Sequence, residues 1–286
     1  MQTLDRLALR DWPLPQHDDG SDKEDRGQVL VVAGSREIPG AALLSATAAL
    51  RAGAGKLTIA TAQSVAPGLA LLMPEARVIG LPETPSGGLL ASGAEQLASC
   101  AANCSAVLAG PGLLDSEGSC EFVERLLRQL TGVPVILDAL AMDVVLQMPR
   151  FDSPVLLTPH AGEMAHLCGQ RKDDVKADAP ALARAMAVKH NAVVALKGAT
   201  TFIISPEGEA WCHVSANAGL GTSGSGDVLA GIITGLAARG APLVQATAWG
   251  VFVHALAGQR LAERHGRLGF LAREILREIP SVMRDL

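Results

Sequence analysis

The chain is poor in aromatic residues: its 286 positions include five Phe, three Trp and no Tyr. Proteins that bind single-stranded nucleic acids without sequence preference stack the bases on such rings, so the composition argues against that class. Runs of basic residues are also missing, and the net charge of −5 argues against binding to a phosphate backbone. We therefore expect small-molecule ligands and no nucleic-acid partner.

The five cysteines are odd in number and form no CxxC pair, which argues against a disulfide framework and against a zinc ribbon. No unbroken apolar run approaches the roughly 18 residues of a membrane-spanning helix. The N-terminus lacks a basic segment followed by an apolar stretch, the pattern typical of a secretory signal. We expect a cytoplasmic protein with reduced thiols and no membrane partner.

After residue 27, short runs rich in Val, Ile and Leu alternate with helical patterns. This alternation predicts an α/β fold with three α/β/α layers and a central, mostly parallel sheet. The predicted strands cover 28–33, 56–61, 105–109, 133–137, 153–157 and 192–196, with a hairpin over 200–205 and 209–213. The predicted helices cover 40–52, 118–130, 174–189, 225–239, 242–264 and 270–279.

The segment 11–27 is polar, charged and rich in turn-forming residues. We expect residues 1–27 to form an exposed arm that leads into the fold. No internal repeat or linker interrupts the rest of the chain, and its composition is 49% hydrophobic and 19% charged. These features predict a single domain over residues 1–286.

The most informative segment is residues 217–235, NAGLGTSGSGDVLAGIITG. Four glycines lie between positions 219 and 226, and glycine lets a backbone approach a ligand closely because it has no Cβ atom. Apolar residues at helical spacing follow at once, so the free amides of the first helical turn face the loop. Such a loop and helix terminus bind anions, and we predict a phosphate site.

Asp227 lies beside this predicted anion site, where its carboxylate repels a phosphate unless it has a further role. Binding Mg²⁺ or accepting a proton from an attacking hydroxyl would supply that role. The structural alternative is a helix N-cap, which Asp often provides. The residue alone leaves both interpretations open.

A GxGxxG pattern at 219–224 matches the fingerprint of dinucleotide-binding folds. That fingerprint requires a preceding strand and an acidic residue about 20 positions later. No Asp or Glu occurs between Asp227 and Glu263, which argues against a dinucleotide fold. The phosphate-loop motif GxxxxGK[ST] does not occur either.

Two further segments follow predicted strands and should lie at the carboxyl edge of the sheet, where open α/β folds bind ligands. Within TPHAGE, residues 158–163, a zinc site would combine His160 and Glu163 with His166, but histidines six positions apart do not share a helical face. The structural alternative is a capping His160 and a solvated Glu163. Within KGATT, residues 197–201, the lysine either meets a polyphosphate or is an exposed turn residue.

Together these segments resemble the ADP/ATP-dependent NAD(P)H-hydrate dehydratases, a branch of the ribokinase-like superfamily. NAGLGTSGSGDVLAGIITGLAARG resembles their nucleotide-loop signature, and other segments follow the order of the family over nearly the whole chain from Arg26. These segments are RGQVLVVAGSREIPGAALLSATAALRAGAGKLTIAT (26–61), LAGPGL (108–113), VILDAL (135–140), LLTPHAGEMAHL (156–167) and VALKGATTFIISPEG (194–208).

The resemblance implies a ribokinase-like fold and an ADP-dependent (S)-NAD(P)H-hydrate dehydratase. Such an enzyme uses ADP or ATP with Mg²⁺ to phosphorylate the hydrate of NADH or NADPH and then eliminates phosphate, which with ADP gives NAD(P)H, AMP and phosphate. The resemblance also implies a homo-oligomer such as a tetramer. Many bacterial relatives carry a fused epimerase domain, so here we expect another chain to supply that activity.

The resemblance assigns site residues as well. Asp227 is the expected catalytic residue and a substrate contact, and no metal ion held by the protein alone is expected. Further substrate contacts are expected from Ala41, Gly112, His160 and Glu163. Nucleotide contacts are expected from Lys197, Gly198, Ala199, Thr200, Thr201, Asn217, Gly219, Gly221, Thr222, Ser223, Gly224, Ser225 and Gly226.

The chain departs from the family pattern at three positions. Leu140 replaces the second carboxylate of LDADAL, Ala161 replaces the proline of TPHPGE, and Ser223 replaces a glycine of GTGGSGD. Loss of a carboxylate would weaken a Mg²⁺ or phosphate network, so a non-catalytic nucleotide sensor is one alternative. A sugar or thiazole-alcohol kinase of the same superfamily is the other, although GSREIPGA and TPHAGEM resemble the dehydratases and not the sugar kinases.

Overall fold

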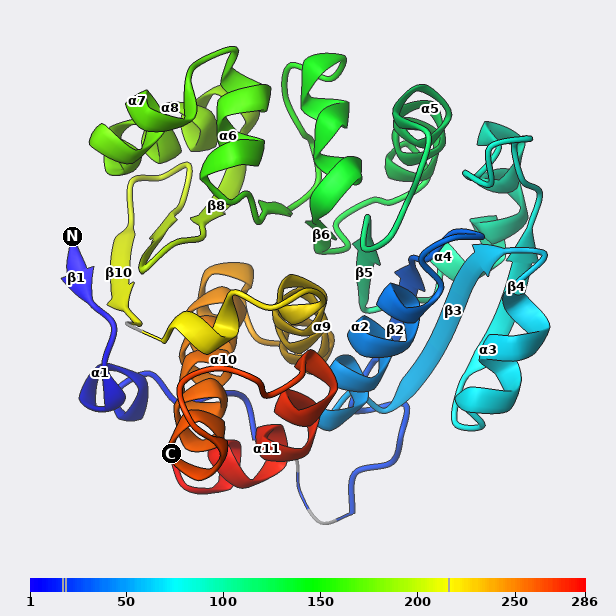
Figure 1. Cartoon of the computed structure of the whole chain (residues 1–286). Coiled ribbons are helices and arrows are strands. Elements are labelled where there is room, and N and C mark those ends of the chain that lie inside the picture. The colour runs from blue at the N-terminus through cyan, green and yellow to red at the C-terminus, as the bar shows by residue number, and fades with distance from the viewer. Residues whose placement is uncertain (17, 19, 216) are drawn as a thin grey trace.

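A computed structural model describes residues 1–16, 18, 20–215 and 217–286. They contain one ten-stranded sheet with the strand order β1-β10-β9-β8-β7-β6-β5-β2-β3-β4. All neighbouring strands pair in parallel except β9, which is antiparallel to both β8 and β10. Helices cover both faces of this sheet (Figure 1), which confirms the predicted three-layer α/β/α fold.

The strands are β1 (Gln2–Thr3), β2 (Gln28–Val32), β3 (Lys56–Ala62), β4 (Arg77–Leu81), β5 (Ala106–Ala109), β6 (Val135–Leu137), β7 (Val155–Leu157), β8 (Ala192–Leu196), β9 (Thr200–Ile204) and β10 (Ala210–Val214). The α-helices are α1 (Arg6–Arg10), α2 (Gly40–Arg51), α3 (Ala66–Leu72), α4 (Ala98–Ala101), α5 (Ser116–Leu127), α6 (Ala161–Cys168), α7 (Lys172–Ala177), α8 (Ala179–His190), α9 (Ser225–Ala238), α10 (Leu243–His265) and α11 (Ala272–Arg284). Short 3-10 helices are η1 (Ala91–Gly93), η2 (Glu95–Leu97), η3 (Ala139–Leu146) and η4 (Ala218–Leu220).

The central strands are buried on both faces because helices cover each side. In β2, Val29 and Val31 face the core formed with α2, α9, α10 and α11, whereas Leu30 and Val32 face the core formed with α5 and η3. Successive side chains of a strand point to opposite faces. A strand buried on both faces therefore appears in the sequence as a continuous apolar run.

Helix α9 lies at the centre of one helical layer and packs closely on α2. Gly231 and Gly235 make this approach possible, since a Cβ atom at either position would overlap the carbonyl oxygens of Ser45 and Ala49 in α2. The close packing fixes the position of α9. It therefore also fixes the glycine loop that leads into the helix.

The strand order reverses between β2 and β5. From β2 the chain continues through β3 to β4 on one side, whereas β5, β6, β7 and β8 follow on the other. Ligands of open α/β sheets bind outside the carboxyl ends of the strands at such a reversal. The loops after β2 and β5 are therefore candidates for ligand contacts.

The expectation of an exposed arm over residues 1–27 is wrong for its first half. Leu4, Leu9 and Leu14 are buried, and β1 adds a strand to the edge of the sheet beside β10. Residues 22–26 are exposed as predicted, whereas positions 17 and 19 of the expected arm lie outside the described residues.

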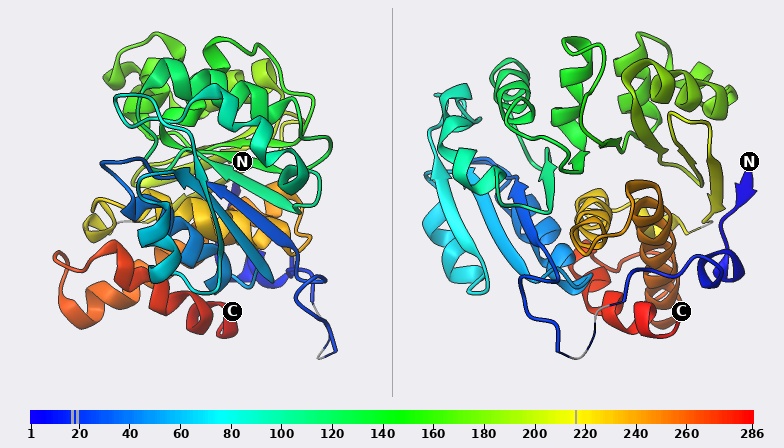
Figure 2. Two further views of the ribbon diagram at one scale, coloured as in Figure 1. Left: turned by 90° about the vertical axis from the view of Figure 1, so that its right-hand side faces the viewer. Right: turned by 180° about the vertical axis from the view of Figure 1, so that it is seen from behind.

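Trp12 anchors this N-terminal segment. Its ring stacks on Trp211 of β10 with centroids 5.4 Å apart, and its carbonyl oxygen accepts hydrogen bonds from Gln245 and Trp249 of α10. Figure 2 shows the segment running from β1 across α10. Residues 1–14 therefore hold β10 and α10 together.

Two other predictions about individual elements need correction. The helix expected over 174–189 is divided into α7 and α8 at Asp178, which has φ −135° and ψ 47°. Pro180 lies in the first turn of α8, where its missing N–H is tolerated. The sequence-based prediction also missed β4, which contains Gly80 and a partly exposed row of side chains.

Candidate active site

Three parallel strands deliver polar side chains to the same edge of the sheet. Asp138 follows β6, Thr158 follows β7 and Lys197 follows β8. Oδ1 of Asp138 accepts hydrogen bonds from Thr158 Oγ1 at 2.6 Å and from Lys197 Nζ at 3.0 Å. Asp138 is only 3% exposed, and these partners offset the cost of burying its charge.

Lys197 is surrounded by acidic groups. Besides Asp138, Oε2 of Glu163 lies 4.0 Å from its Nζ atom. Burial by itself would lower the pKa of Lys197, but Asp138, Glu163 and Asp227 outweigh it and raise the pKa. The side chain is 19% exposed, so the alternative of an exposed turn lysine is wrong. Lys197 is a largely covered ammonium held among carboxylates.

The glycine loop ends at the N-terminus of α9. Gly224 is the N-cap residue with φ 85°, and no side chain caps the helix. Asp227 is the third residue of α9, so its alternative assignment as the N-cap is wrong. The amide of Ser225 donates to the carbonyl of Thr222. The amides of Gly226 and Asp227 belong to the first turn, where intrahelical acceptors are missing and anions bind.

Asp227 lies in an environment that favours its protonated form. Burial is the largest cause and the nearby charge of Asp138 adds to it, while Lys197 opposes both, so that the pKa of Asp227 rises from 3.8 to about 6. A general base works best when its pKa is close to the working pH. The pKa of Asp227 is therefore suited to a general base.

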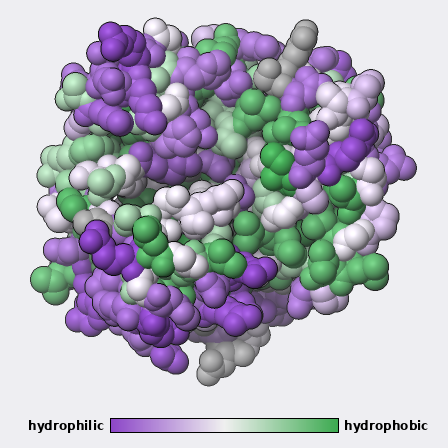
Figure 3. Space-filling view, viewed as in Figure 1, coloured by the Kyte–Doolittle hydropathy of each residue, from purple (hydrophilic) through white to green (hydrophobic). Residues whose placement is uncertain are grey.

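A cavity of about 620 Å³ joins the two predicted nucleotide-binding segments. Figure 3 shows a recess near the middle of this face of the molecule. The predicted nucleotide residues that line the cavity are Lys197, Gly198, Ala199, Thr201, Asn217, Gly221, Thr222, Ser225 and Gly226. His160 also lines it, so TPHAGE and KGATT meet here.

The other four predicted nucleotide residues do not line this cavity. Thr200 pairs with Val214 in the hairpin, and Ser223 is exposed. A Cβ atom at Gly219 would overlap the ring of Phe270, and one at Gly224 would lie 2.6 Å from Leu44. These two glycines allow close packing of the loop against α11 and α2.

His160 caps a helix. Its Nδ1 atom accepts hydrogen bonds from the amides of Gly162 and Glu163 at 2.9 and 3.1 Å, and Glu163 accepts from the His160 amide in return. The capping alternative is therefore correct, whereas the solvated Glu163 that accompanied it is not. His166 lies 3.2 Å from Asp143, and within the described ranges no three potential ligands converge on a metal site.

His160 and Glu163 also line a second cavity of about 460 Å³, together with Leu140. His160 thus stands between this cavity and the larger one. The position at which Leu140 replaces a family carboxylate belongs to the smaller cavity. The substitution makes that wall apolar.

Ala41 and Gly112, the other predicted substrate contacts, lie together near the reversal of strand order. A Cβ atom at Gly112 would come within 2.7 Å of the Cβ atom of Ala41 and of the carbonyl oxygen of Ile38. Gly112 has φ 67°, so both its conformation and its surroundings require glycine.

The sequence-based prediction missed His254. Its Nε2 atom lies 3.0 Å from Oγ of Ser225, in the first turn of α9. Burial lowers the pKa of His254 from 6.5 to about 4, so the ring is neutral at physiological pH. Ser225 lies 29 residues before His254 in the sequence. No local motif indicates that a histidine within an apolar helix contacts a residue so distant in the chain.

The remaining sequence expectations concern cysteines and membranes. All five cysteines are free thiols in this structure. Within the described part of the chain, no helix combines the length and the apolar character that crossing a bilayer requires.

Comparison with known proteins identifies the family. The family model described as NAD(P)H-hydrate dehydratase matches residues 29–281. The ADP-dependent (S)-NAD(P)H-hydrate dehydratase of Xanthomonas campestris is 48% identical, over 99% of this chain and 96% of that protein.

Two solved structures share the fold. The ADP/ATP-dependent NAD(P)H-hydrate dehydratase of Bacillus subtilis, co-crystallised with ATP and Mg²⁺, is 31% identical with a TM-score of 0.81, and the match covers 95% of this chain and 94% of that one. A ribokinase-like superfamily protein of Enterococcus faecalis is 27% identical with a TM-score of 0.82 over 95% and 92% of the two chains. The chain belongs to the NAD(P)H-hydrate dehydratase family and has its ribokinase-like fold.

Proposed function

We propose that the protein is an ADP-dependent (S)-NAD(P)H-hydrate dehydratase, which repairs hydrated NADH and NADPH. The observation that carries this proposal is Asp227, a carboxylate with a pKa of about 6 in the first turn of α9, between an anion-binding loop and Lys197. The similarity to the Xanthomonas campestris dehydratase supports the choice of ADP and of the hydrate.

In the proposed reaction, Asp227 accepts the proton of the substrate hydroxyl as that oxygen attacks the terminal phosphorus of ADP. The bond from this phosphorus to the bridging oxygen breaks, and AMP leaves. The new phosphate ester then loses phosphate with the electron pair of its C–O bond, assisted by the lone pair of the ring nitrogen, which leaves a cationic ring. The neighbouring ring carbon then loses a proton to the departing phosphate or to water, and its C–H electron pair forms the ring double bond of NAD(P)H. Amides of the first turn of α9 stabilise the charge of the transferring group.

The buried cluster around Lys197 supports this chemistry in two ways. Its ammonium lies close to the α9 terminus, since a Cβ atom at Gly226 would be 3.5 Å from Nζ. This charge attracts the phosphates toward the loop. At the same time Lys197 and Asp138 act in opposite directions on the pKa of Asp227, so the cluster adjusts the strength of the base.

The carboxylates fit a Mg²⁺ ion that arrives with the nucleotide. Mg²⁺ is usually held by one or two carboxylates together with substrate phosphates, and a complete protein cage is not needed. The two side-chain hydrogen bonds to Asp138 described above reach Oδ1, and Oδ2 lies 4.0 Å from where a Cβ atom of Gly226 would be. Asp138 could thus hold the ion beside the loop, where the ion would neutralise phosphate charge.

The proposal assigns the ligands to the two sides of the crevice. The larger cavity, with KGATT and the loop 217–226, takes ADP or ATP. Ala41, Gly112, His160, Glu163 and Asp227 contact the hydrate. The proposal also includes a single domain over residues 1–286, a cytoplasmic location and a homotetramer.

An assay of purified protein with hydrate, ADP and Mg²⁺ tests the proposal. We expect the near-ultraviolet absorbance of reduced nicotinamide to appear together with an equal amount of free phosphate. A small-molecule kinase would stop at a phosphate ester, and a nucleotide sensor would bind ADP without turnover. Phosphate release that depends on the hydrate would exclude both alternatives.

A further inference from the structure

The proposed nucleotide cavity continues into a second one. A cavity of about 510 Å³ is lined by His213, Phe252, Leu256, Gln259 and Arg267, among others, and it shares His213, Ser215, Asn217, Ala218 and Ala255 with the larger cavity. The larger cavity holds the phosphate-binding segments KGATT and 221–226. The shared residues would be within reach of the base of a nucleotide whose phosphates occupied those segments.

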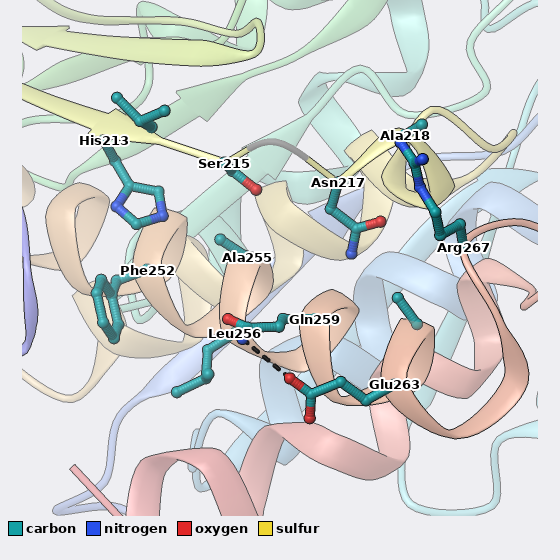
Figure 4. A pocket seen from close by; sticks show the side chains of 12 residues that line it. His213, Ser215, Asn217, Ala218, Phe252, Ala255, Leu256, Gln259, Glu263 and Arg267 are labelled. Atoms are coloured by element: carbon teal, nitrogen blue, oxygen red, sulfur yellow. Dashed lines mark hydrogen bonds between the residues drawn. The ribbon is translucent and has the colours of Figure 1, made fainter.

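His213 stands where the two cavities meet, at the end of β10. Its ring packs edge-on against Phe252, with ring centroids 5.2 Å apart. Figure 4 shows Arg267 at the opposite end of the cavity in this view, with the apolar side chains of Ala255 and Leu256 between them. An apolar slot with a few polar groups at its ends suits a planar base.

The N-terminal segment fixes the chemical form of His213. Nδ1 of His213 lies 2.9 Å from the carbonyl oxygen of Leu4. A carbonyl oxygen only accepts, so Nδ1 carries the hydrogen and donates it, and Nε2 of the neutral ring has a free lone pair. Leu4 is itself held, since it is 2% exposed and its amide donates to Cys212. The tautomer is therefore set by the fold.

Nε2 faces the cavity. In Figure 4 one ring nitrogen of His213 points toward the side of Ser215 and Ala255, and the other points away from them. Because Nδ1 bonds Leu4, which directly follows the edge strand β1, the nitrogen on the cavity side is Nε2. The cavity thus presents a hydrogen-bond acceptor at this point. An exocyclic amino group can donate to it, whereas a carbonyl oxygen in the same place meets a lone pair.

We infer that His213 is a specificity residue that selects nucleotides with an amino group at C6 of the purine, as in adenine, over those with a carbonyl there, as in hypoxanthine or guanine. This inference rests on the proposed function, because it takes the shared cavity as the nucleotide site. It gives the N-terminal segment a role as well. By bonding Nδ1, Leu4 keeps the acceptor nitrogen of His213 directed at the base.

Calorimetric titration of the full chain with ADP and with inosine diphosphate tests this inference, at a pH of about 8, above the range in which imidazoles usually protonate. We expect the wild-type protein to bind ADP about tenfold more tightly, the effect of one hydrogen bond of ordinary strength. His213→Phe keeps an aromatic ring but removes the acceptor, so both nucleotides should bind within about twofold of each other.

Two further variants separate recognition from packing. His213→Gln offers an amide that can accept or donate, so it should bind inosine diphosphate more tightly than the wild type does. His265→Phe is the matched control, since His265 is exposed at the end of α10 and should leave the ratio unchanged.

An unchanged preference for ADP in His213→Phe, or a wild-type protein that binds both diphosphates equally, would overturn the inference and leave the proposed function intact. A wild-type protein that binds neither nucleotide would overturn the proposed function and the inference together.

Discussion

The Nζ atom of Lys197 lies 3.0 Å from Oδ1 of Asp138, and these two opposite charges act on a third residue, Asp227. Asp138 raises the pKa of Asp227, whereas Lys197 lowers it, and burial raises it more than either charge shifts it. The pKa of Asp227 therefore depends on burial and on both charges of the ion pair.

Asp227→Asn should lower turnover of the hydrate by about 10²–10⁴-fold, since the amide cannot accept the proton and general-base catalysis contributes that much. Binding of ADP should change little, because the backbone amides of α9 remain in place. Steady-state rates and calorimetric titration with ADP measure the two effects. Turnover above about a tenth of the wild-type rate would contradict the assignment of Asp227 as the base.

The pH at which kcat/KM falls on the acid side (the acid limb) should shift in opposite directions in Asp138→Asn and Lys197→Met. In the wild type, kcat/KM should rise with pH through about 6 as Asp227 loses its proton. Asp138→Asn removes the charge that raises the pKa of Asp227, so the limb should move to lower pH. Lys197→Met removes the charge that lowers it, so the limb should move to higher pH. A shift in the same direction in both variants would show that another group controls the limb.

Asp227→Asn should also make the folded protein more stable above pH 6. Folding raises the pKa of Asp227 from 3.8 to about 6, so the folded state binds the proton more tightly than the unfolded state. The stabilisation from this carboxyl is full below pH 3.8 and is lost as the pH rises through about 6. The midpoint of thermal unfolding of Asp227→Asn should exceed that of the wild type at pH 8, and the difference should shrink toward pH 4. Equal midpoints at pH 8 would contradict the raised pKa.

His254 should make the protein sensitive to acid. Its folded pKa of about 4 lies below the ordinary value of 6.5, so the unfolded state binds a proton that the folded state excludes. Stability from this residue is present above pH 6.5 and is lost as the pH falls through about 4. In His254→Phe, the free energy of unfolding should therefore decrease less between pH 6.5 and about pH 4 than it does in the wild type. It also leaves the Ser225 hydroxyl without its partner, at a cost of about 1–3 kcal/mol.

The double variant His254→Phe/Ser225→Ala is the control for that cost. Removing both partners of a buried hydrogen bond is nearly neutral when the shapes fit, so the double variant should regain stability relative to His254→Phe alone. Chemical denaturation at several pH values measures both effects. If the single and double variants are equally stable, the hydrogen bond between His254 and Ser225 does not contribute to the stability of the folded protein.

The sequence predicted the sheet well because each central strand is buried on both faces and appears as an apolar run, as in Val29–Val32 of β2. It predicted the glycine loop because several glycines directly before an apolar helical pattern mark the point where the loop ends and the helix begins. It missed the N-terminal segment, where Leu4 and Leu9 are buried but the apolar Leu7 between them is exposed, so that no regular apolar period marks the buried positions. It missed the Ser225–His254 pair because that contact depends on how α9 and α10 pack, and no local pattern encodes it.

His160 combines two roles that a pair of substitutions can separate. Its Nδ1 atom caps α6, and its side chain lines both the cavity assigned to the nucleotide and the smaller cavity beside Glu163. His160→Ala removes both the cap and the ring, so it should raise KM for the hydrate and also cost about 1 kcal/mol of stability. His160→Asn keeps a good capping side chain, so it should raise KM for the hydrate with little change in stability.

Steady-state kinetics with the hydrate and thermal unfolding of the two variants provide the test. If His160→Asn restores both stability and KM to the wild-type values, then His160 acts only as a cap. In that case the hydrate contact would have to come from other residues of the crevice, such as Glu163.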